Sequence, residues 1–221
     1  MTVGPEPSPS LAPVTLDGTH VRLEPLTRAH FDALCAVGLD PALHEFSLSR
    51  MATRDDLRRY VDRALADRDQ GTALPFVHVE RASGRVVGST RFGNYAAEHG
   101  RVEIGWTWIA APWQRTAINT EAKRLLLAHA FDALGVHRVE FKADARNHRS
   151  RAALLRLGAV EEGTLRRHMV TDDGHVLDTV YFSIVADEWP AVRAGLDARL
   201  NARVSAHLAS TADARQNPEP D

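Results

Sequence analysis

The sequence predicts a mixed α/β fold with a partly antiparallel sheet. Strand-like segments dominate the middle of the chain, amphipathic helical segments interrupt them twice, and turn signals at residues 82–84 and 172–174 join neighbouring strands as hairpins. The 221 residues are 44% hydrophobic and 25% charged, which is ordinary for a soluble globular protein. This length fits one domain whose core can bury most of its apolar surface.

The N-terminal half is predicted to place two helices before the first hairpin. Residues 20–26 alternate apolar and polar side chains as a strand does, and Thr27 can cap a helix that extends to about Gly38. Residues 53–69 are predicted to form a second amphipathic helix with Thr53 as its cap. The hairpin follows, with strands at residues 74–80 and 85–95.

The C-terminal half is predicted to alternate strands with helices. Residues 101–109 are apolar on both faces, as in a central strand that is covered on both sides. A long helix over residues 120–134 is expected to end at Gly135, and a shorter helix over residues 147–157 at Gly158. The remaining elements are strands at residues 136–143, 159–170 and 175–185 and a last helix over residues 188–202.

The two ends of the chain are predicted to lie outside the folded domain. Residues 1–13 are rich in Pro and Ser, and residues 205–221 are polar, so neither segment can bury enough apolar surface to order itself. We therefore expect a disordered leader over residues 1–13, a folded domain over residues 14–204 and a disordered tail over residues 205–221.

Charge, hydropathy and cysteine count argue against several classes of partner. A formal net charge of −2 gives no sign of a nucleic-acid-binding surface. No apolar run approaches the about 20 residues that span a bilayer, so we expect no membrane partner. The single cysteine, Cys35, precludes an intrachain disulfide and favours a reducing, cytoplasmic compartment. The chain is expected to act as a monomer or a homodimer.

The connection between the strand at residues 101–109 and the next helix is the most informative segment. It places a short loop, residues 114–119, directly before a long helix. The first amides of a helix have no partner within the helix, and the helix dipole adds about half a positive charge there. Such a junction can hold a pyrophosphate without many basic side chains. An ordinary strand-to-helix connection has the same pattern, so the loop alone leaves both interpretations open.

This loop resembles the acyl-CoA loop of the GNAT superfamily, in which Gln or Arg is followed by two residues, Gly, one residue, and Gly or Ala. Gln114 matches the first position, whereas Ala117 stands where Gly is expected and Asn119 stands where Gly or Ala is expected. Ala117 removes the freedom of positive φ, so the loop must adopt a conformation that is open to an L-residue. Asn119 can cap the helix.

A second segment carries the resemblance independently. Asn147 and Ser150 resemble the Asn-x-x-Ser of the RimJ/RimL branch of ribosomal-protein N-acetyltransferases. Gly158 fits the Gly that closes the following helix, although Ala159 replaces the usual aromatic residue. Many relatives carry a Tyr acid where this chain has Leu154, so that acid is absent. The segments 119–122 and 125–131 also look like that branch, and the resemblance covers about residues 14–187.

The resemblance implies the GNAT fold, a central, mostly antiparallel twisted sheet of about seven strands with helices on both faces. It also implies an N-acetyltransferase that moves the acetyl group of acetyl-CoA to a primary amine by direct attack in a ternary complex. A lysine amine with a pKa of about 10.4 is only about 0.04% neutral at pH 7, whereas an α-amine near 8 is about 10% neutral. A base is therefore expected, more so for a lysine acceptor.

Several residues receive roles from this resemblance and from their positions. Glu103 is the candidate base, acting through water, because burial among Val, Ile and Trp makes a carboxylate more basic; alternatively, it faces solvent or pairs with Arg101 or Arg91. Ser150 is expected to contact the cofactor sulfur and return a proton to it, with a simple first-turn hydroxyl as the alternative. The main chain at Trp108 and Ile109 is expected to pair with the pantetheine arm and to stabilise the oxyanion. The predicted cofactor-binding residues are Trp108, Ile109, Gln114, Arg115, Thr116, Ala117, Ile118, Asn119, Thr120, Asn147 and Ser150.

The sequence leaves other functions open. A non-catalytic protein that binds or senses acyl-CoA would share the same loop. A nucleotide-binding protein is disfavoured because neither G-x-G-x-x-G nor G-x-x-x-x-G-K-[ST] occurs. A metal enzyme is disfavoured because His137, Glu140, Asp144 and His148 follow no known ligand spacing, so we expect no metal cofactor.

Further side chains are candidates for the site without an assigned role. His168 and His175 are alternative bases, since they flank the last hairpin. Trp106, Trp108 and Trp113 either line the cofactor groove or pack in the core. The acceptor is open among a protein or peptide N-terminus, a lysine and a small amine. The first two helices, residues 88–96 and residues 168–178 are expected to shape its pocket.

Overall fold

The computed structural model describes the backbone of residues 10–216 and the side chains of residues 10–203. Within these residues, eight strands form one sheet in the order β1-β2-β3-β4-β5-β6-β8-β7. All neighbouring strands are antiparallel except β5 and β6, which are parallel. The strands are β1 (Leu16–Asp17), β2 (Val21–Pro25), β3 (Leu74–Glu80), β4 (Val86–Ala96), β5 (Arg101–Ile109), β6 (Arg138–Asp144), β7 (Val160–Val170) and β8 (Val176–Val185). The mixed α/β class and the mostly antiparallel sheet are confirmed.

The sheet has one strand more than the seven or so that the resemblance implies. The additional strand is β1, in which Leu16 pairs with Leu23 and Asp17 with Arg22 of β2. A strand of two residues is too short for apolar and polar alternation to reveal it in the sequence.

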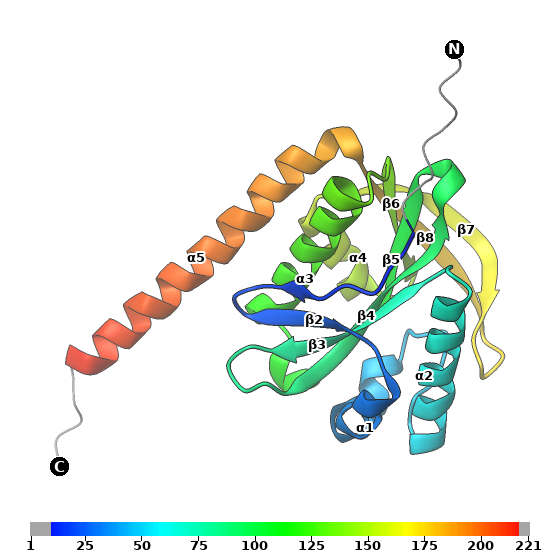
Figure 1. The fold of residues 1–221 in the computed structure, drawn as a ribbon, viewed down its shortest axis with the longest axis horizontal. Helices are drawn as coiled ribbons and strands as arrows, with labels where there is room; N and C mark the ends of the chain where they lie inside the picture. Colours follow the sequence, from blue (N-terminus) through cyan, green and yellow to red (C-terminus); the bar gives the residue numbers. More distant parts are fainter. Residues whose placement is uncertain (1–9, 217–221) are drawn as a thin grey trace.

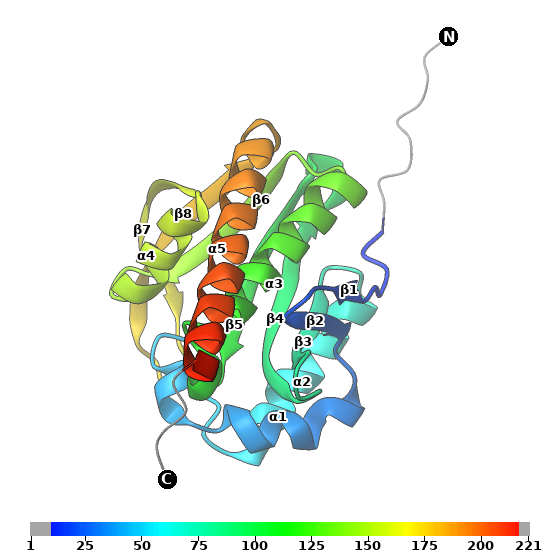
Figure 2. The ribbon, with the colours of Figure 1, turned by 90° about the vertical axis from the view of Figure 1, so that its left-hand side faces the viewer.

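Helices cover both faces of the sheet (Figure 1 and Figure 2). On one face α1 and α2 pack against Val77 of β3 and Trp108 of β5. On the opposite face α3, α4 and α5 pack over a core that includes Phe92 and Phe141. The helices are α1 (Phe31–Gly38), α2 (Arg54–Asp69), α3 (Ala117–Ala128), α4 (His148–Leu157) and α5 (Trp189–Gln216). Short helical turns are η1 (Arg28–His30), η2 (Pro41–His44), η3 (Ala97–His99), η4 (Ala111–Trp113), the π-helical η5 (His129–Ala133) and η6 (Ala186–Glu188).

Local signals delimit α2 and α4 where the sequence predicts. The side chain of Thr53 accepts the N–H of Asp56, and the carboxylate of Asp56 accepts the N–H of Thr53, which together make a capping box. Gly158 closes α4 with a left-handed φ of 102°, which a residue without Cβ adopts at little cost. A Cβ at this position would also lie 3.0 Å from Val192 of α5.

The start of α3 differs from the prediction. The helix begins at Ala117, not at Thr120, and its cap is Thr116, whose side chain accepts the N–H of Ile118. The prediction that Asn119 caps the helix is therefore wrong, because Asn119 lies inside the first turn. The small residue Ala117 and the hydroxyl of Thr116 together favour an earlier start than the apolar stripe alone suggests.

Both ends of the folded region differ from the prediction as well. The last helix, predicted to end near residue 202, continues as α5 to Gln216, so residues 205–216 are helical. Leu11, inside the predicted leader, is buried in the main core. Residues 1–9 and 217–221, the remainder of the predicted leader and tail, lie outside the described residues. No helix among the described residues is both long enough and apolar enough to cross a membrane.

Candidate functional site

β5 and β6 separate along their length. Parallel pairing joins residues 101–103 to residues 138–140, and no register partners follow, although β5 continues to Ile109 and β6 to Asp144. Trp106, in the separated part of β5, has a φ of 51°, which marks a local irregularity of the strand. The separation leaves residues 104–109 of β5 without register partners on β6.

The main chain at the end of β5 faces this separation. Ala110 donates its N–H to the carbonyl of Val87 in β4 at 2.9 Å. Because successive residues of a strand direct their backbone polar groups to opposite sides, the N–H and C=O of Ile109 face away from β4. The carbonyl of Ile109 accepts a hydrogen bond from Nε2 of Gln114 at 2.8 Å. By the same alternation Trp108 faces β4 with its main chain, and its side chain is buried against α1. Of these two predicted residues, Ile109 therefore presents its amide to the separation.

The N-terminus of α3 lies immediately beyond this strand. The side chain of Thr116 accepts the N–H of Ile118 at 3.3 Å. The amides of Ala117 and Asn119, in the same turn, have no acceptor within the helix and lie at the positive end of its dipole. Ala117 and Asn119, which replace small residues of the motif, have helical backbone conformations. The half-buried Thr120 follows in the same turn. This helix end can bind an anion through main-chain groups.

Arginine side chains surround the loop that leads into α3. Arg115 belongs to the loop and has a left-handed φ of 64°, so it, and not Ala117, takes the conformation that glycine would favour. Nη1 of Arg149 in α4 donates to Oε1 of Gln114 at 3.2 Å. Nη1 of Arg203 in α5 donates to the carbonyl of Arg115 at 2.8 Å. Two helices, α4 and α5, thus place a guanidinium group at the predicted pyrophosphate loop, which itself contains Arg115.

The N-terminus of α4 brings Asn147 and Ser150 together. Oδ1 of Asn147 accepts the N–H of Ser150 at 2.9 Å, so Asn147 caps the helix. The amide nitrogen of Asn147 is a donor that this cap does not use. Ser150 lies half-buried in the first turn, and Leu154, at the position of the absent Tyr, is buried one turn later.

Glu103 is a buried carboxylate with two charged or polar partners. Its side chain is 7% exposed, and Oε2 lies 2.7 Å from Nζ of Lys142 and accepts from Nδ2 of Asn94 at 2.7 Å. The predicted burial of Glu103 is confirmed. The alternative prediction was wrong, because Glu103 neither faces solvent nor pairs with Arg101 or Arg91.

Lys142 connects Glu103 to the last hairpin. Burial acts to lower the pKa of Lys142, but the charge and hydrogen bond of Glu103, together with Tyr181, outweigh it, so the pKa is raised. Nζ of Lys142 lies 5.1 Å from the ring centre of Tyr181, whose ring meets that of His168 edge-on at 5.7 Å. The candidate bases Glu103 and His168 are therefore linked through two side chains, while His175 is exposed near the hairpin turn.

A second lysine lies under the separated strands. Lys123 of α3 is 8% exposed, and its Nζ donates to Oγ1 of Thr107 in β5 at 2.9 Å. Oγ1 of Thr107 also lies 2.7 Å from Oγ1 of Thr90 in β4. The ammonium group is 5.9 Å from the ring centre of Phe141 in β6. Burial lowers the pKa of Lys123 to about 7.

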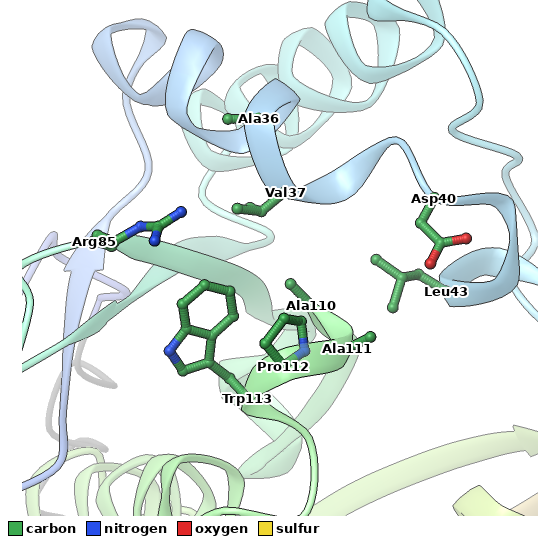
Figure 3. A pocket seen from close by; sticks show the side chains of 9 residues that line it. All are labelled: Ala36, Val37, Asp40, Leu43, Arg85, Ala110, Ala111, Pro112 and Trp113. Atoms are coloured by element: carbon green, nitrogen blue, oxygen red, sulfur yellow. The ribbon is translucent and has the colours of Figure 1, made fainter.

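The three tryptophans near the loop have different surroundings. Trp108 packs in the core and Trp106 is 37% exposed. Trp113 lines a cavity of about 470 Å³ between α1, η2 and the turn Ala111–Trp113 (Figure 3). The guanidinium group of Arg85 lies 5.2 Å from the ring centre of Trp113, a cation–π contact at the rim of this cavity. Trp113 thus borders an open space next to the loop.

Several of these side chains were not identified from the sequence as site residues. Among them are Asn94, Lys123, Lys142, Arg149 and Arg203. Lys123 had a weak signal, because it is a lysine adjoining the apolar stripe of a helix. The partners of Lys142 and Arg203 are far away in the sequence, so no local pattern indicates them. No group of three or more His, Cys, Asp or Glu side chains among the described residues is arranged to hold a metal ion.

Known proteins resemble this chain in sequence and fold. Residues 20–160 match the family Acetyltransferase (GNAT) domain. The Bacillus subtilis (strain 168) protein "Putative ribosomal N-acetyltransferase YdaF" is 35% identical over 106 residues, which are 48% of this chain and only 57% of that protein's length. A GCN5-related N-acetyltransferase from Brucella melitensis superposes with a TM-score of 0.80 at 32% identity, covering 87% of each chain. Mycobacterium smegmatis RimJ, solved in complex with CoA-disulfide, superposes with a TM-score of 0.69 at 26% identity, covering 87% of this chain and 95% of that one. The chain described here belongs to the GNAT acetyltransferase family.

Proposed function

We propose that this protein transfers the acetyl group of acetyl-CoA to a primary amine by direct attack within a ternary complex. The observation that carries the proposal is the separation of β5 from β6, which leads directly to the N-terminus of α3. An extended arm fits along the open edge of β5, and a diphosphate fits the positive end of a helix.

The residues around this separation suit coenzyme A. The Ile109 amide offers a hydrogen bond to an extended arm, and Asn147 offers its side-chain amide from the opposite wall. The first-turn amides of α3 and the nearby guanidinium groups offer donors and positive charge to phosphates. Acetyl-CoA, when bound, supplies an activated acetyl thioester. The cofactor-binding residues of the proposal are Ile109, Gln114, Arg115, Thr116, Ala117, Ile118, Asn119, Thr120, Asn147, Ser150 and, added from the structure, Arg149 and Arg203; Trp108 is left out because its main chain faces β4.

Two side chains receive chemical roles. Glu103 accepts the proton of the attacking amine, through water, with Lys142 and Asn94 fixing its orientation. Ser150 donates a hydrogen bond to the cofactor sulfur from the first turn of α4. The backbone N–H of Ile109 stabilises the negative charge that develops on the carbonyl oxygen during attack.

The α-amine at the N-terminus of a ribosomal protein is the acceptor that the named relatives support. One relative carries the name of a ribosomal N-acetyltransferase, and a solved neighbour is named RimJ. An α-amine is about 10% neutral at pH 7, so its deprotonation demands less of a base than that of a lysine. Small primary amines remain acceptors to be tested beside peptides.

Coenzyme A is expected to stabilise the fold selectively. At a ligand concentration of about 100 times Kd, binding adds about 2.7 kcal/mol to the free energy of unfolding. For a chain of this size such a gain raises Tm by about 5–11 °C. Thermal melting with acetyl-CoA, CoA, ATP and NAD measures this effect. Equal shifts with all four ligands, or none with CoA, would contradict the proposal.

Release of the free thiol distinguishes an enzyme from a protein that only binds acyl-CoA. We expect thiol release from acetyl-CoA to accelerate with a subset of a panel of N-terminal peptides and small amines. Glu103 is held in an ion pair and no Tyr acid is present, which are the features that favour the non-catalytic alternative. Tight CoA binding with a flat response across the panel would establish that alternative.

Replacement of Gln114 by Ala is expected to weaken CoA binding. The Gln114 side chain ties the loop to the Ile109 carbonyl and to Arg149, so its loss frees the loop at both ends. Two hydrogen bonds of this kind contribute about 1–2 kcal/mol, which corresponds to about a 5- to 30-fold rise in Kd. Isothermal titration with CoA checks the value. Gln70→Ala, at the exposed C-terminus of α2, is the matched control, and an equal loss in both variants would contradict the assigned role.

A further inference from the structure

We propose that Lys123 gives a proton to the sulfur that leaves from acetyl-CoA, with Thr107 holding the ammonium group beside the separated strands. The inference rests on the proposed function and adds a catalytic residue to it. Lys123 belongs to neither the acyl-CoA loop nor the Asn147–Ser150 segment.

The position of Lys123 follows from the helix and the two strands around it. Side chains of a helix tilt toward its N-terminus, so Lys123 points back toward the loop that begins α3. Its Nζ contacts Thr107 of β5 at 2.9 Å and lies 5.9 Å from the ring centre of Phe141 of β6. Both residues lie beyond the last paired positions, Glu103 and Glu140. The ammonium group therefore lies where the strands have parted, directly beneath the exposed Thr107.

Among the side chains that the structure describes, none with a carboxylate pairs with Lys123. Lys123 is 92% buried, since only 8% is exposed, and burial is the cause that lowers its pKa to about 7. His78 of β3 is the titratable group that faces it, and burial together with the Lys123 charge lowers the pKa of His78 to about 3, so that His78 stays neutral. On the same helix, Glu121 accepts main-chain amides of residues 19–21, and Arg124 pairs with Asp197 of α5.

The other side chains of the site do not supply a proton donor for the leaving thiolate. A thiol with a pKa of about 8.5 leaves as a thiolate at neutral pH unless a donor protonates it. The best donor titrates near the working pH, as Lys123 does, whereas the hydroxyl of Ser150 can donate a hydrogen bond but gives up no net proton there. Leu154, at the position of the missing Tyr, carries no acidic group.

The step balances with the groups at hand. The amine nitrogen forms a bond to the carbonyl carbon, the carbon–sulfur bond breaks, and its electron pair stays on sulfur. Lys123 transfers one ammonium proton to that sulfur and becomes a neutral amine. The proton lost by the attacking amine passes through Glu103 or water to solvent, and solvent later reprotonates Lys123.

The ionisation of bound CoA tests the inference without an acceptor. A group that stays charged beside the sulfur favours the thiolate, whereas Lys123, with a pKa of about 7, is mostly neutral near pH 8. In Lys123→Arg the thiol of bound CoA is therefore expected to titrate at least about one unit below its value in the wild type, because Arg keeps its charge. Lys123→Met carries no charge, so its bound thiol should titrate at or above the wild-type value. Arg124→Met, on the same helix but facing α5, is the matched control and should equal the wild type. Ultraviolet absorbance of the thiolate, followed from about pH 6 to pH 10, gives each value.

Measurements of kcat distinguish a Lys123 that donates a proton from one that supplies only positive charge. With the amine that gives the fastest thiol release, both Lys123→Arg and Lys123→Met are expected to lower kcat about 10²-fold with little change in the KM for acetyl-CoA. Equal thiol titration in Lys123→Arg and the wild type would overturn the inference, while retained CoA binding would leave the proposed function intact. Loss of CoA binding by the wild type would overturn the proposed function itself. If Lys123→Arg does not fold, Thr107→Val and the NMR titration of the Lys123 Nζ with and without CoA replace it, and an unchanged Lys123 pKa would overturn the inference.

Discussion

Replacing Glu103 by Gln is expected to lower kcat by about 10²- to 10⁴-fold, the usual contribution of a general base. Gln keeps the shape of the side chain and an oxygen that can face Lys142 and Asn94, but it does not take up a proton at neutral pH. The KM for acetyl-CoA should change little, because Glu103 lies on β5 before the strands separate. Steady-state kinetics with the acceptor identified by thiol release gives both parameters.

The pH dependence of this loss identifies its cause. As the pH approaches about 8, an α-amine acceptor becomes neutral without help, so the deficit of Glu103→Gln should shrink as the pH rises. Glu140→Gln is the matched control, because Glu140 is the register partner of Glu103 on β6, is also buried, and pairs with Arg101 and Arg138. Equal, pH-independent losses in the two variants would show that Glu103 acts only through its ion pair with Lys142.

The helix ends and the hairpin turn that were predicted correctly depend on residues close to them in the sequence. Thr53, Gly158 and the turn at residues 172–174 each act within a few residues of their own position, so their effects follow from the sequence alone. Asn147 also acts locally, because its side chain caps α4 by accepting the N–H of Ser150 three residues later. Asn147 was also predicted as a site residue. The burial of Glu103 was predicted because its neighbours along β5 are apolar.

The features that could not be predicted from the sequence depend on contacts between segments that are far apart in the chain. The partner of Glu103 is 39 positions away, at Lys142, and depends on which strand lies beside β5. The parallel pairing of β5 with β6, and the insertion of β8 between β6 and β7, follow from packing of the whole sheet and from no periodicity in it. The length of α5 is a similar case, since a polar composition suggested a tail although the first turns of the helix pack on α3.

Removal of the Glu121 carboxylate is expected to cause the largest loss of stability. Glu121 lies in α3 and is 7% exposed, and its two carboxylate oxygens accept the N–H groups of Thr19, His20 and Val21 at 2.9, 2.6 and 2.8 Å. Glu121→Ala leaves three main-chain donors without this acceptor, in a segment where hydrogen bonds to a charged group contribute about 1.5–3 kcal/mol each. Because such contributions are not additive, we expect the free energy of unfolding to fall by about 3–5 kcal/mol and Tm by about 6–20 °C.

The size of this loss separates a buried carboxylate from an ordinary surface charge. Asp197→Asn removes the half-buried partner of Arg124, whose ion pair lies at the surface, and should cost less than about 1 kcal/mol. The loss of unfolding free energy in Glu121→Gln should lie between the losses in Glu121→Ala and Asp197→Asn. One amide oxygen still accepts a hydrogen bond, while the NH₂ group faces a main-chain donor. Chemical denaturation followed by tryptophan fluorescence gives the three values, and hydrogen exchange should show the amides of Thr19, His20 and Val21 losing protection in Glu121→Ala. A loss in Glu121→Ala as small as that in Asp197→Asn would contradict this structural role.

Glu121 belongs to the segment that resembles the RimJ/RimL branch, and its contacts give it a structural role. It joins the turn between β1 and β2 to α3, the helix whose N-terminus forms the proposed diphosphate site.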